Sequence, residues 1–255
     1  MRHVYRESLE TMCTSFRRLE GQLPPPERVD QEDSFVFRYR DKGIPQALIQ
    51  KLARNISGLH AIDILLLNGF VQEQAVLQRT LDEIHEDIFF LAAAITNDTV
   101  TDRHRQYLRA FYDDPILRSG KHSERFQKPN LVPRKKIHAY VHRLLYKDRQ
   151  SPSDSQIEEV ISTAYSGYVH AASPYIMDMY GGDPPQFMIS GLLGTPRIVD
   201  HVEDAWNYFY RGLLSTCVVA KAFGDAELVT SLYDYMLTFE RKSGKSGYAH
   251  ERTGM

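Results

Sequence analysis

A stretch of thirteen residues, QRTLDEIHEDIFF (78–90), concentrates side chains that transfer protons and bind ions. Histidine changes its charge near neutral pH, and arginine and carboxylates pair with ionic ligands or with each other. The charged residues of this stretch are Arg79, Asp82, Glu83, His85, Glu86 and Asp87. They form either a functional site or the solvated face of a helix, and the spacing of their apolar neighbours bears on that choice.

Helical periodicity predicts a helix over 71–96 with one buried face. The apolar face holds Leu77, Leu81, Ile84, Ile88, Leu91 and Ile95. Phe89, Phe90 and Ala93 continue the opposite, charged face toward the end of the helix. Because a face with two phenylalanines is rarely left open to water, we expect another segment of the protein to cover it.

The same cover, if it extends over the charged half, partly desolvates Arg79 and Glu83. These two residues are four positions apart and therefore neighbours on the helix, so they must pair with each other or with a ligand. His85 lies beside the apolar face. It is either a hydrogen-bonded core histidine or a catalytic acid or base.

A second feature is the distribution of charge along the chain. The net charge of the chain is −2, yet residues 103–149 hold thirteen Lys or Arg against four Asp or Glu. The remainder of the chain is correspondingly acidic. A basic segment of this kind is typical of contact with nucleic acid, RNA included, or with another polyanion.

The most basic part of that segment, PRKKIHAYVHRLLYK, is helical in period. Its candidate binding residues are Arg134, Lys135, Lys136, His138, His142 and Arg143. Such groups neutralise phosphates, and the tyrosines among them can stack on bases. The alternative is a solvated cationic helix, or one docked on the acidic remainder of the protein.

The elements that must position these residues are helices. Apolar spacing, prolines and capping residues predict them at 3–20, 45–69, 71–96, 101–114, 134–147, 156–172, 196–223 and 225–241. Residues 34–40 alternate in polarity and form an extended segment, but no pairing partner is evident. The sequence therefore predicts an all-α fold, a bundle of seven or eight helices.

We expect a single domain made of the N-terminal helix at 3–20, a core bundle over 45–241 and a flexible tail at 243–255. The turn-rich connection at 181–195 is the one plausible subdivision. The helix at 197–223 is apolar around much of its circumference, which indicates a central core helix or, alternatively, a homodimer interface.

Composition sets further limits on function. At 255 residues and 42% hydrophobic content the chain can bury a sizeable core, and no apolar run is long enough to span a membrane. We expect a cytoplasmic protein without a targeting segment. Cys13 and Cys217 are too few for a disulfide framework and are expected to be small buried hydrophobic residues, because no local sequence supplies the base or cation that a thiolate nucleophile needs. No Glu-x-x-His pair, phosphate loop or paired-cysteine motif is present, so no metal or cofactor is predicted.

Two short motifs resemble a prokaryotic all-helical family of unknown function. NGFVQEQAVLQRTLDE and the later YSGYVHAA match its Arg-x-Leu-x-Glu and Ser-x-x-x-His helices over about 45–240. The matching positions are Arg79, Leu81, Glu83, Ser166 and His170. That family carries no established chemistry, so the resemblance implies a helical fold and a short set of binding residues.

A second resemblance is to the helical HEPN ribonucleases, whose signature is Arg, four to six residues, then His. RNISGLH supplies Arg54 and His60, and RTLDEIH supplies Arg79 and His85, beside Glu83. The resemblance implies that histidine activates the ribose hydroxyl or protonates the leaving oxygen, while arginine stabilises the phosphorane without a metal. The sequence thus leaves two functions: a polyanion-binding accessory protein acting through 103–149, or a metal-independent endoribonuclease.

Overall fold

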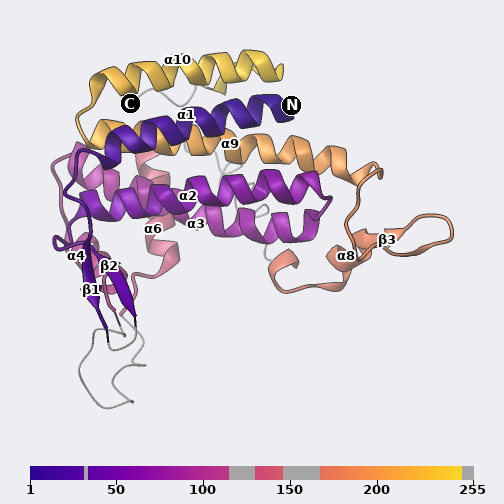
Figure 1. Ribbon diagram of the computed structural model, residues 1–255, viewed down its shortest axis with the longest axis horizontal. Helices are drawn as coiled ribbons and strands as arrows, with labels where there is room; N and C mark the ends of the chain where they lie inside the picture. The colour runs from indigo at the N-terminus through magenta and orange to yellow at the C-terminus, as the bar shows by residue number, and fades with distance from the viewer. Residues whose placement is uncertain (32–33, 115–129, 146–166, 249–255) are drawn as a thin grey trace.

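The computed structural model describes residues 1–31, 34–114, 130–145 and 167–248, which are predominantly helical (Figure 1). The helices are α1 (Arg2–Glu20), α2 (Ile44–Leu67), α3 (Val71–Thr96), α4 (Asp102–Phe111), α6 (Arg134–Leu145), α8 (Ser173–Ile176), α9 (Arg197–Ala222) and α10 (Ala226–Ser243), with a 3₁₀ helix, η1, at Met177–Met179. The strands are β1 (Glu27–Asp30), β2 (Phe35–Arg38), β3 (Tyr180–Gly181) and β4 (Gln186–Phe187). The predicted helical fold class is therefore confirmed. Within the described ranges, no helix combines the length and apolarity needed to cross a membrane.

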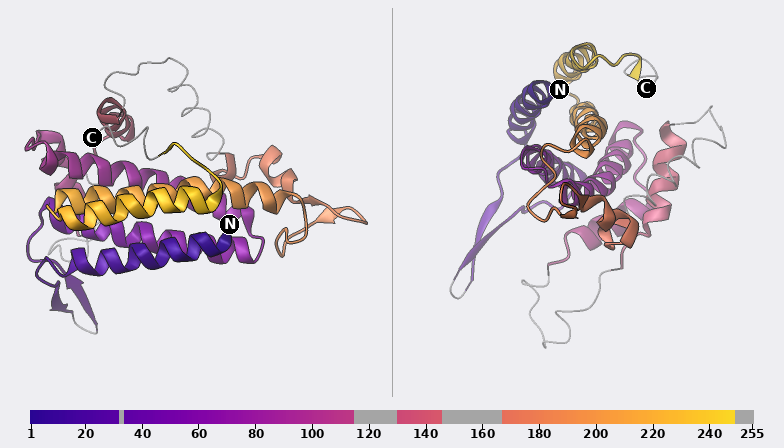
Figure 2. Two further views of the ribbon diagram at one scale, coloured as in Figure 1. Left: turned by 90° about the horizontal axis from the view of Figure 1, so that it is seen from above. Right: turned by 90° about the vertical axis from the view of Figure 1, so that its right-hand side faces the viewer.

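Five long helices, α1, α2, α3, α9 and α10, lie side by side and form the bundle (Figures 1 and 2). α9 is the central helix, since it packs against α1, α2, α3 and α10. α4 and α6 pack against α3 on the outside of the bundle. The β1–β2 hairpin and the β3 segment extend from opposite ends of the bundle (Figure 1).

Most of the apolar surface of α9 packs into the core of its own chain, although Val199 near its start is exposed. Trp206, Phe209 and Leu213 have no exposed area. The ring of Phe209 stacks on Tyr5 of α1 with 4.2 Å between centroids, and the indole N–H of Trp206 donates to Ser243 Oγ at 2.7 Å. The core-helix interpretation is thus confirmed. Most of the side chains that suggested a homodimer interface on this helix are buried within the chain, whereas Val218 is partly exposed.

A glycine fixes the corner where α2 turns into α3. Gly69 has a φ of +75°, a conformation that residues with a Cβ rarely adopt. A Cβ there would lie 2.6 Å from the backbone nitrogen of Leu193. The Leu192 N–H donates to the Gly69 carbonyl at 2.8 Å. This close approach ties the connection before α9 to the start of α3, and so sets where the N-terminal halves of the two helices meet.

The prediction that residues 34–40 lack a pairing partner is wrong. β2 pairs antiparallel with β1 in the register Glu27↔Arg38 and Asp30↔Phe35. The segment ERVD contains one apolar residue and shows no alternation, so its sequence does not indicate a strand. Phe35 remains half-exposed, with the Arg28 guanidinium 4.2 Å from its ring centroid. The hairpin therefore adds little to the core.

A second hairpin occupies the start of the predicted connection at 181–195. β3 and β4 pair antiparallel in the register Tyr180↔Phe187, and α8 and η1 precede them. Two-residue strands carry too little pattern to be recognised in a sequence. The helix predicted over 156–172 falls mostly outside the described residues, which resume at 167.

Candidate functional site

The aromatic end of α3 is covered, as the sequence predicts. Phe89, Phe90 and Ala93 are buried. The ring of Phe90 stacks on His104 of α4 at 4.1 Å between centroids and meets the edge of Tyr140 of α6 at 5.2 Å. α4 and α6 are therefore the cover, and both bring polar residues toward α3.

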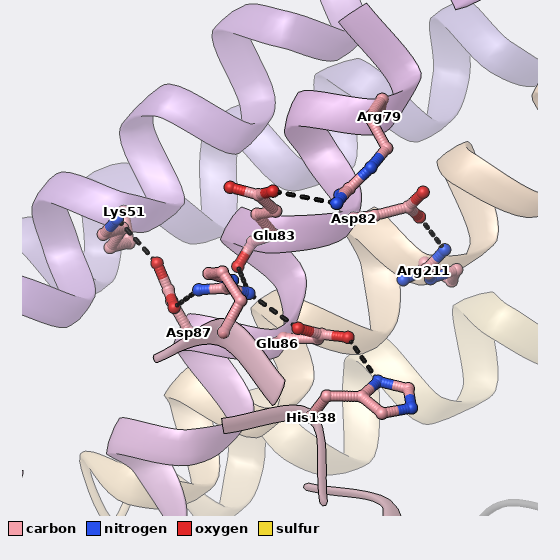
Figure 3. Close-up of polar contacts among 9 residues, drawn as sticks. Lys51, Arg79, Asp82, Glu83, Glu86, Asp87, His138 and Arg211 are labelled. Atoms are coloured by element: carbon pink, nitrogen blue, oxygen red, sulfur yellow. Dashed lines mark hydrogen bonds and ion pairs between the residues drawn. The ribbon is translucent and has the colours of Figure 1, made fainter. Parts of the chain in front are cut away.

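The charged band of α3, residues 79–87, is paired with cations from three other helices (Figure 3). Lys51 comes from α2, Arg134 and His138 from α6, and Arg211 from α9. The pairs are Arg79–Glu83 at 3.0 Å, Glu86–Arg134 at 2.6 Å, Glu86–His138 at 2.8 Å, Asp87–Lys51 at 2.8 Å, Asp87–Arg134 and Asp82–Arg211. This arrangement is neither a purely solvated face nor an open site, because most of the band joins α3 to its neighbours.

Arg134 makes the densest set of these contacts. Its guanidinium donates to the carboxylates of Asp87 and Glu86 and, at 3.0 Å, to the backbone carbonyl of Glu83. Burial lowers the pKa of the Arg134 guanidinium, but the attraction of Asp87 and Glu86 outweighs that effect, so the net pKa is raised. Arg134 and His138 thus dock α6 on α3, and the prediction that both contact an external polyanion is not supported by their orientation.

Arg79 and Glu83 adopt the first of the two predicted arrangements and pair with each other. Both are on α3, one turn apart, and their side chains are 29% and 42% exposed. Pairs this exposed contribute at most about 1 kcal/mol to stability. The pair is therefore accessible to solvent and is not a strong structural contact.

His85 is a core histidine in this structure. It is buried, its Nδ1 lies 2.6 Å from Ser215 Oγ of α9, and its ring centroid lies 4.6 Å from that of Phe89. Arg79 pairs with Glu83 on another side of the helix. Six positions on an α-helix differ by about 120° in direction. The two residues therefore do not meet within one chain as a nuclease pair would.

Arg54 and His60 on α2 are both exposed and have the same six-residue separation. His60 instead approaches Cys13 of α1, with 3.4 Å between Nε2 and Sγ. The local sequence of Cys13 supplies no base, but another helix brings His60 beside it, and both cysteines are partly exposed and not buried as expected. Cys13 and His60 are 47 positions apart and meet only because α1 packs on α2.

A polar seam runs between α3 and α9 inside the bundle. We define the α3–α9 polar seam by Gln74, Gln78, Asp82 and His85 of α3 and Tyr208, Arg211 and Ser215 of α9. Its C-terminal half is satisfied internally. Asp82 accepts hydrogen bonds from Arg211 and, at 3.3 Å, from the Tyr208 hydroxyl, and His85 bonds Ser215.

In the N-terminal half of the seam, the polar side chains are not hydrogen-bonded in this way. Gln74 and Gln78 have no exposed area, and the amide oxygen and nitrogen of both side chains lack hydrogen-bond partners among the described residues. Buried polar groups in proteins are nearly always bonded, so this pair requires an explanation. The sequence reasoning missed them, although they precede His85 by 11 and 7 residues and so share its direction on the helix.

The basic segment is divided between two faces of α6. Ile137 and Val141 are buried against α3 on the same side as Arg134. Lys135, Lys136 and Arg143 are exposed on the other side, which we call the α6 outer face. The basic residues 118, 121, 125, 128, 147 and 149 lie outside the described residues. The structure thus separates docking cations from outward-facing ones.

The neighbouring helix α4 also carries cations. His104 of α4 and Tyr140 of α6 have ring centroids 5.6 Å apart, which places the two helices side by side. Arg103 and Arg109 of α4 are exposed, whereas Arg105 pairs with Asp102 at 2.7 Å. α4 therefore extends the set of outward-facing cations beside α6.

The remaining predicted binding residues are not gathered with these. Ser166 lies outside the described residues, so its predicted relation to His170 stays a prediction; His170 itself is exposed. His142 is half-buried on α6, with its ring centroid 6.2 Å from that of His138. Within the described ranges, no three His, Cys, Asp or Glu side chains are grouped as metal ligands would be.

Comparison with family models, curated proteins and solved structures found no significant match. The two resemblances drawn from the sequence therefore rest on their short motifs alone.

Proposed function

We propose that this protein binds a polyanion, RNA being the first candidate, through the α6 outer face and the adjoining cations of α4. The observation that carries the proposal is the exposure of Lys135, Lys136 and Arg143 on a helix that contains no acidic residue. None of the three has a carboxylate partner among the described residues. Cations left without carboxylate partners are available to neutralise phosphates.

The inner face of α6 supports the same proposal. Arg134 and His138 hold the helix on α3 through Glu86 and Asp87. The outward cations consequently sit on a fixed helix, and a site that is already ordered loses less conformational entropy on binding than a flexible one. The acidic band is neutralised by the same contacts, which lessens its repulsion of phosphate at this face.

The endoribonuclease alternative is not favoured by these positions. Arg79 and His85 point to different sides of α3, and His85 is buried against Ser215. Binding of a polyanion requires neither the Arg79–His85 pair nor the Arg54–His60 pair. We further propose a cytoplasmic location, where RNA is accessible and where cysteines such as Cys13 and Cys217 remain reduced.

The test compares RNA binding by two variants of equal charge change. The triple variant Lys135→Ala, Lys136→Ala, Arg143→Ala removes the α6 outer face. The control variant Lys42→Ala, Lys221→Ala, Arg241→Ala removes three exposed cations from other parts of the chain. Binding of a fluorescent single-stranded RNA is measured by anisotropy at low salt, in EDTA, and the same samples are run on a gel to detect cleavage.

The α6 variant is expected to bind about tenfold more weakly or worse, and the control variant like the wild type, since three phosphate contacts are lost only in the former. Equal weakening in both variants would mean that overall charge and not this face attracts RNA. Absence of binding by the wild type would refute the proposal. Cleavage abolished by His85→Ala or His60→Ala would restore the nuclease alternative.

A further inference from the structure

The chain before α9 forms a projection that exposes apolar side chains. We call residues 173–189 the α8–β4 arm, because they contain α8, η1, β3 and β4. The hairpin of this arm extends away from the end of the bundle in two perpendicular views (Figures 1 and 2). Scattered single apolar residues are normal on a protein surface, but their concentration in one short segment indicates an interaction surface. The large apolar residues of the arm that are between 36% and 78% exposed are Ile176, Met177, Tyr180, Phe187 and Ile189.

The rings of Tyr180 and Phe187 lie together on one face of the β3–β4 hairpin. The two residues are paired across the strands, and their ring centroids are 5.0 Å apart. The Met188 N–H donates to the Met179 carbonyl at 2.9 Å, which continues the pairing toward the base of the arm. The arm is therefore built by its own backbone hydrogen bonds, and it holds apolar side chains in place without burying them.

Carboxylates lie at the base of the arm, where it meets the first turns of α9. Burial lowers the pKa of the His201 imidazole in α9, and nearby carboxylates oppose that effect. Those carboxylates belong to Asp204, Asp178 and Asp200, and Asp178 is itself part of the arm. The acidic side chains of α9 thus lie close to the base of the arm.

The charge of this region is strongly one-sided. Residues 173–204 hold five Asp or Glu against one cation, Arg197. Arg197 is already paired with Asp178 at 2.8 Å. A partner that covers the arm therefore meets apolar side chains together with a surplus of carboxylates.

We infer that the α8–β4 arm is the docking surface for a cationic amphipathic helix of another protein. The apolar side of such a helix covers the exposed side chains of the arm, as amphipathic helices do on other apolar surfaces. Its Lys and Arg side chains then face the carboxylates at the base of the arm, which gives the two surfaces complementary charge. The inference does not depend on the α6 outer face.

Two other occupants fit this surface less well. The cytoplasmic surface of a membrane is anionic, and the carboxylates at the base of the arm would be repelled by it. In a second copy of this chain, the most basic described helix is α6, but its Ile137 and Val141 are buried in its own core. That helix therefore has no apolar side left to offer.

The test measures binding of a fluorescein-labelled synthetic helix of Leu and Lys, with the leucines on one face, by anisotropy with the full chain. Two control peptides have the same composition in shuffled order, or Glu in place of Lys. The arm variant combines Met177→Ser, Phe187→Ser and Ile189→Ser. The control variant replaces three apolar residues that are similarly exposed in other parts of the chain and combines Phe35→Ser, Phe37→Ser and Val100→Ser.

The wild type is expected to bind the Leu–Lys helix more tightly than either control peptide. The arm variant, checked for folding by circular dichroism, should bind at least about tenfold more weakly, because three apolar contacts are lost. The control variant should bind like the wild type. The inference is overturned if the wild type does not bind, if both triple variants bind equally, or if the shuffled peptide binds as tightly as the amphipathic one.

A second pair of variants tests the contribution of charge. Asp200→Asn with Asp204→Asn should weaken binding about threefold at low salt, because exposed ion pairs contribute little each, whereas Asp41→Asn with Asp234→Asn should have no effect. Equal binding of the Leu–Glu helix by the wild type would contradict the cationic partner. Sedimentation of the wild type with phosphatidylcholine vesicles, without binding of the Leu–Lys helix, would instead assign the arm to a lipid surface. The outcomes that concern the wild type alone hold even where a variant does not fold.

Discussion

Replacement of Asp87 by alanine should loosen α6 from the bundle. The carboxylate of Asp87 is 6% exposed and holds Lys51 of α2 at 2.8 Å as well as Arg134 of α6. Asp87→Ala removes the acceptor that both cations share. Lys51 and Arg134 then remain partly desolvated, with a smaller compensating charge.

The magnitude follows from the burial of these groups. Loss of one partner of a buried ion pair costs about 3–5 kcal/mol. Arg134 is 35% exposed and keeps Glu86, which reduces the cost through solvent screening and the remaining pair. We therefore expect Asp87→Ala to lower the free energy of unfolding by about 2–3 kcal/mol. At a urea slope of about 2–3 kcal/mol/M, the midpoint falls by about 1 M.

Urea unfolding followed by circular dichroism measures the global effect, and hydrogen exchange of the amides of α6 measures the local one. Asp30→Ala removes an exposed carboxylate that pairs with Arg28 at 2.7 Å, and it should change stability by less than about 0.5 kcal/mol. An unchanged midpoint together with unchanged exchange of residues 134–145 in Asp87→Ala would refute the docking role of the charged band.

Three further predictions concern single buried groups. Burial lowers the pKa of His104 below its ordinary value of 6.5, so at acid pH the unfolded state binds a proton that the folded state does not. The free energy of unfolding should therefore fall as the pH drops below about 6.5. His104→Gln should flatten this dependence, as measured by urea titrations at pH 7 and pH 5.5. Gln78→Met should raise the free energy of unfolding by about 1–2 kcal/mol, measured by urea unfolding, because an unsatisfied buried amide is removed. Burial raises the pKa of Cys217 to about 11, which leaves about one thiolate in a thousand at pH 8, so iodoacetamide should alkylate Cys13 first, as read by peptide mass spectrometry.

A different result would contradict each of these three predictions. A pH dependence that His104→Gln leaves unchanged would place the acid-sensitive group elsewhere; His201, whose pKa burial also lowers, would be the next to replace. A less stable Gln78→Met would mean that the amide has a bonding partner, such as bound water. Equal alkylation of the two cysteines in the folded protein would mean that Cys217 is less enclosed than its surroundings indicate.

The helices, and the need for a segment covering the end of α3, could be predicted because both depend on the spacing of apolar residues within one stretch of sequence. The apolar spacing of α3 identifies its buried face, and the position of Phe89 and Phe90 on the charged side required a neighbour there. A helical period is visible within a few turns of one segment. The identity of the covering helices was not predictable in the same way, because it depends on which later segments of the chain pack against α3.

The role of Arg134 shows why a count of charged residues along the sequence does not tell which cations face solvent. It lies 47 and 48 positions from the two carboxylates that bind it, so the pairing exists only after α6 docks. One signal was present in the sequence: Arg134 shares a helix side with Ile137 and Val141, whereas Lys135 and Lys136 do not. The division of the basic segment into docking and outward cations follows from that spacing.

The sequence does not reveal the polar seam, for a related reason. Gln74 and Gln78 lie beside the apolar face of α3, and helical spacing alone does not show that a polar residue at the edge of that face is fully buried. Their lack of partners depends on the side chains that α9 places opposite them, which the sequence of α3 alone does not contain. The Cys13–His60 contact likewise requires the packing of two helices.

The salt dependence of RNA binding tests the central claim most directly. The logarithm of the binding constant for single-stranded RNA falls with the logarithm of salt concentration by about 0.7 for each phosphate contact. If Lys135, Lys136 and Arg143 each neutralise a phosphate, their joint replacement by alanine reduces this slope by about 2, while the Lys42, Lys221, Arg241 variant keeps the wild-type slope. A triple variant of α6 with the full wild-type slope would contradict the account.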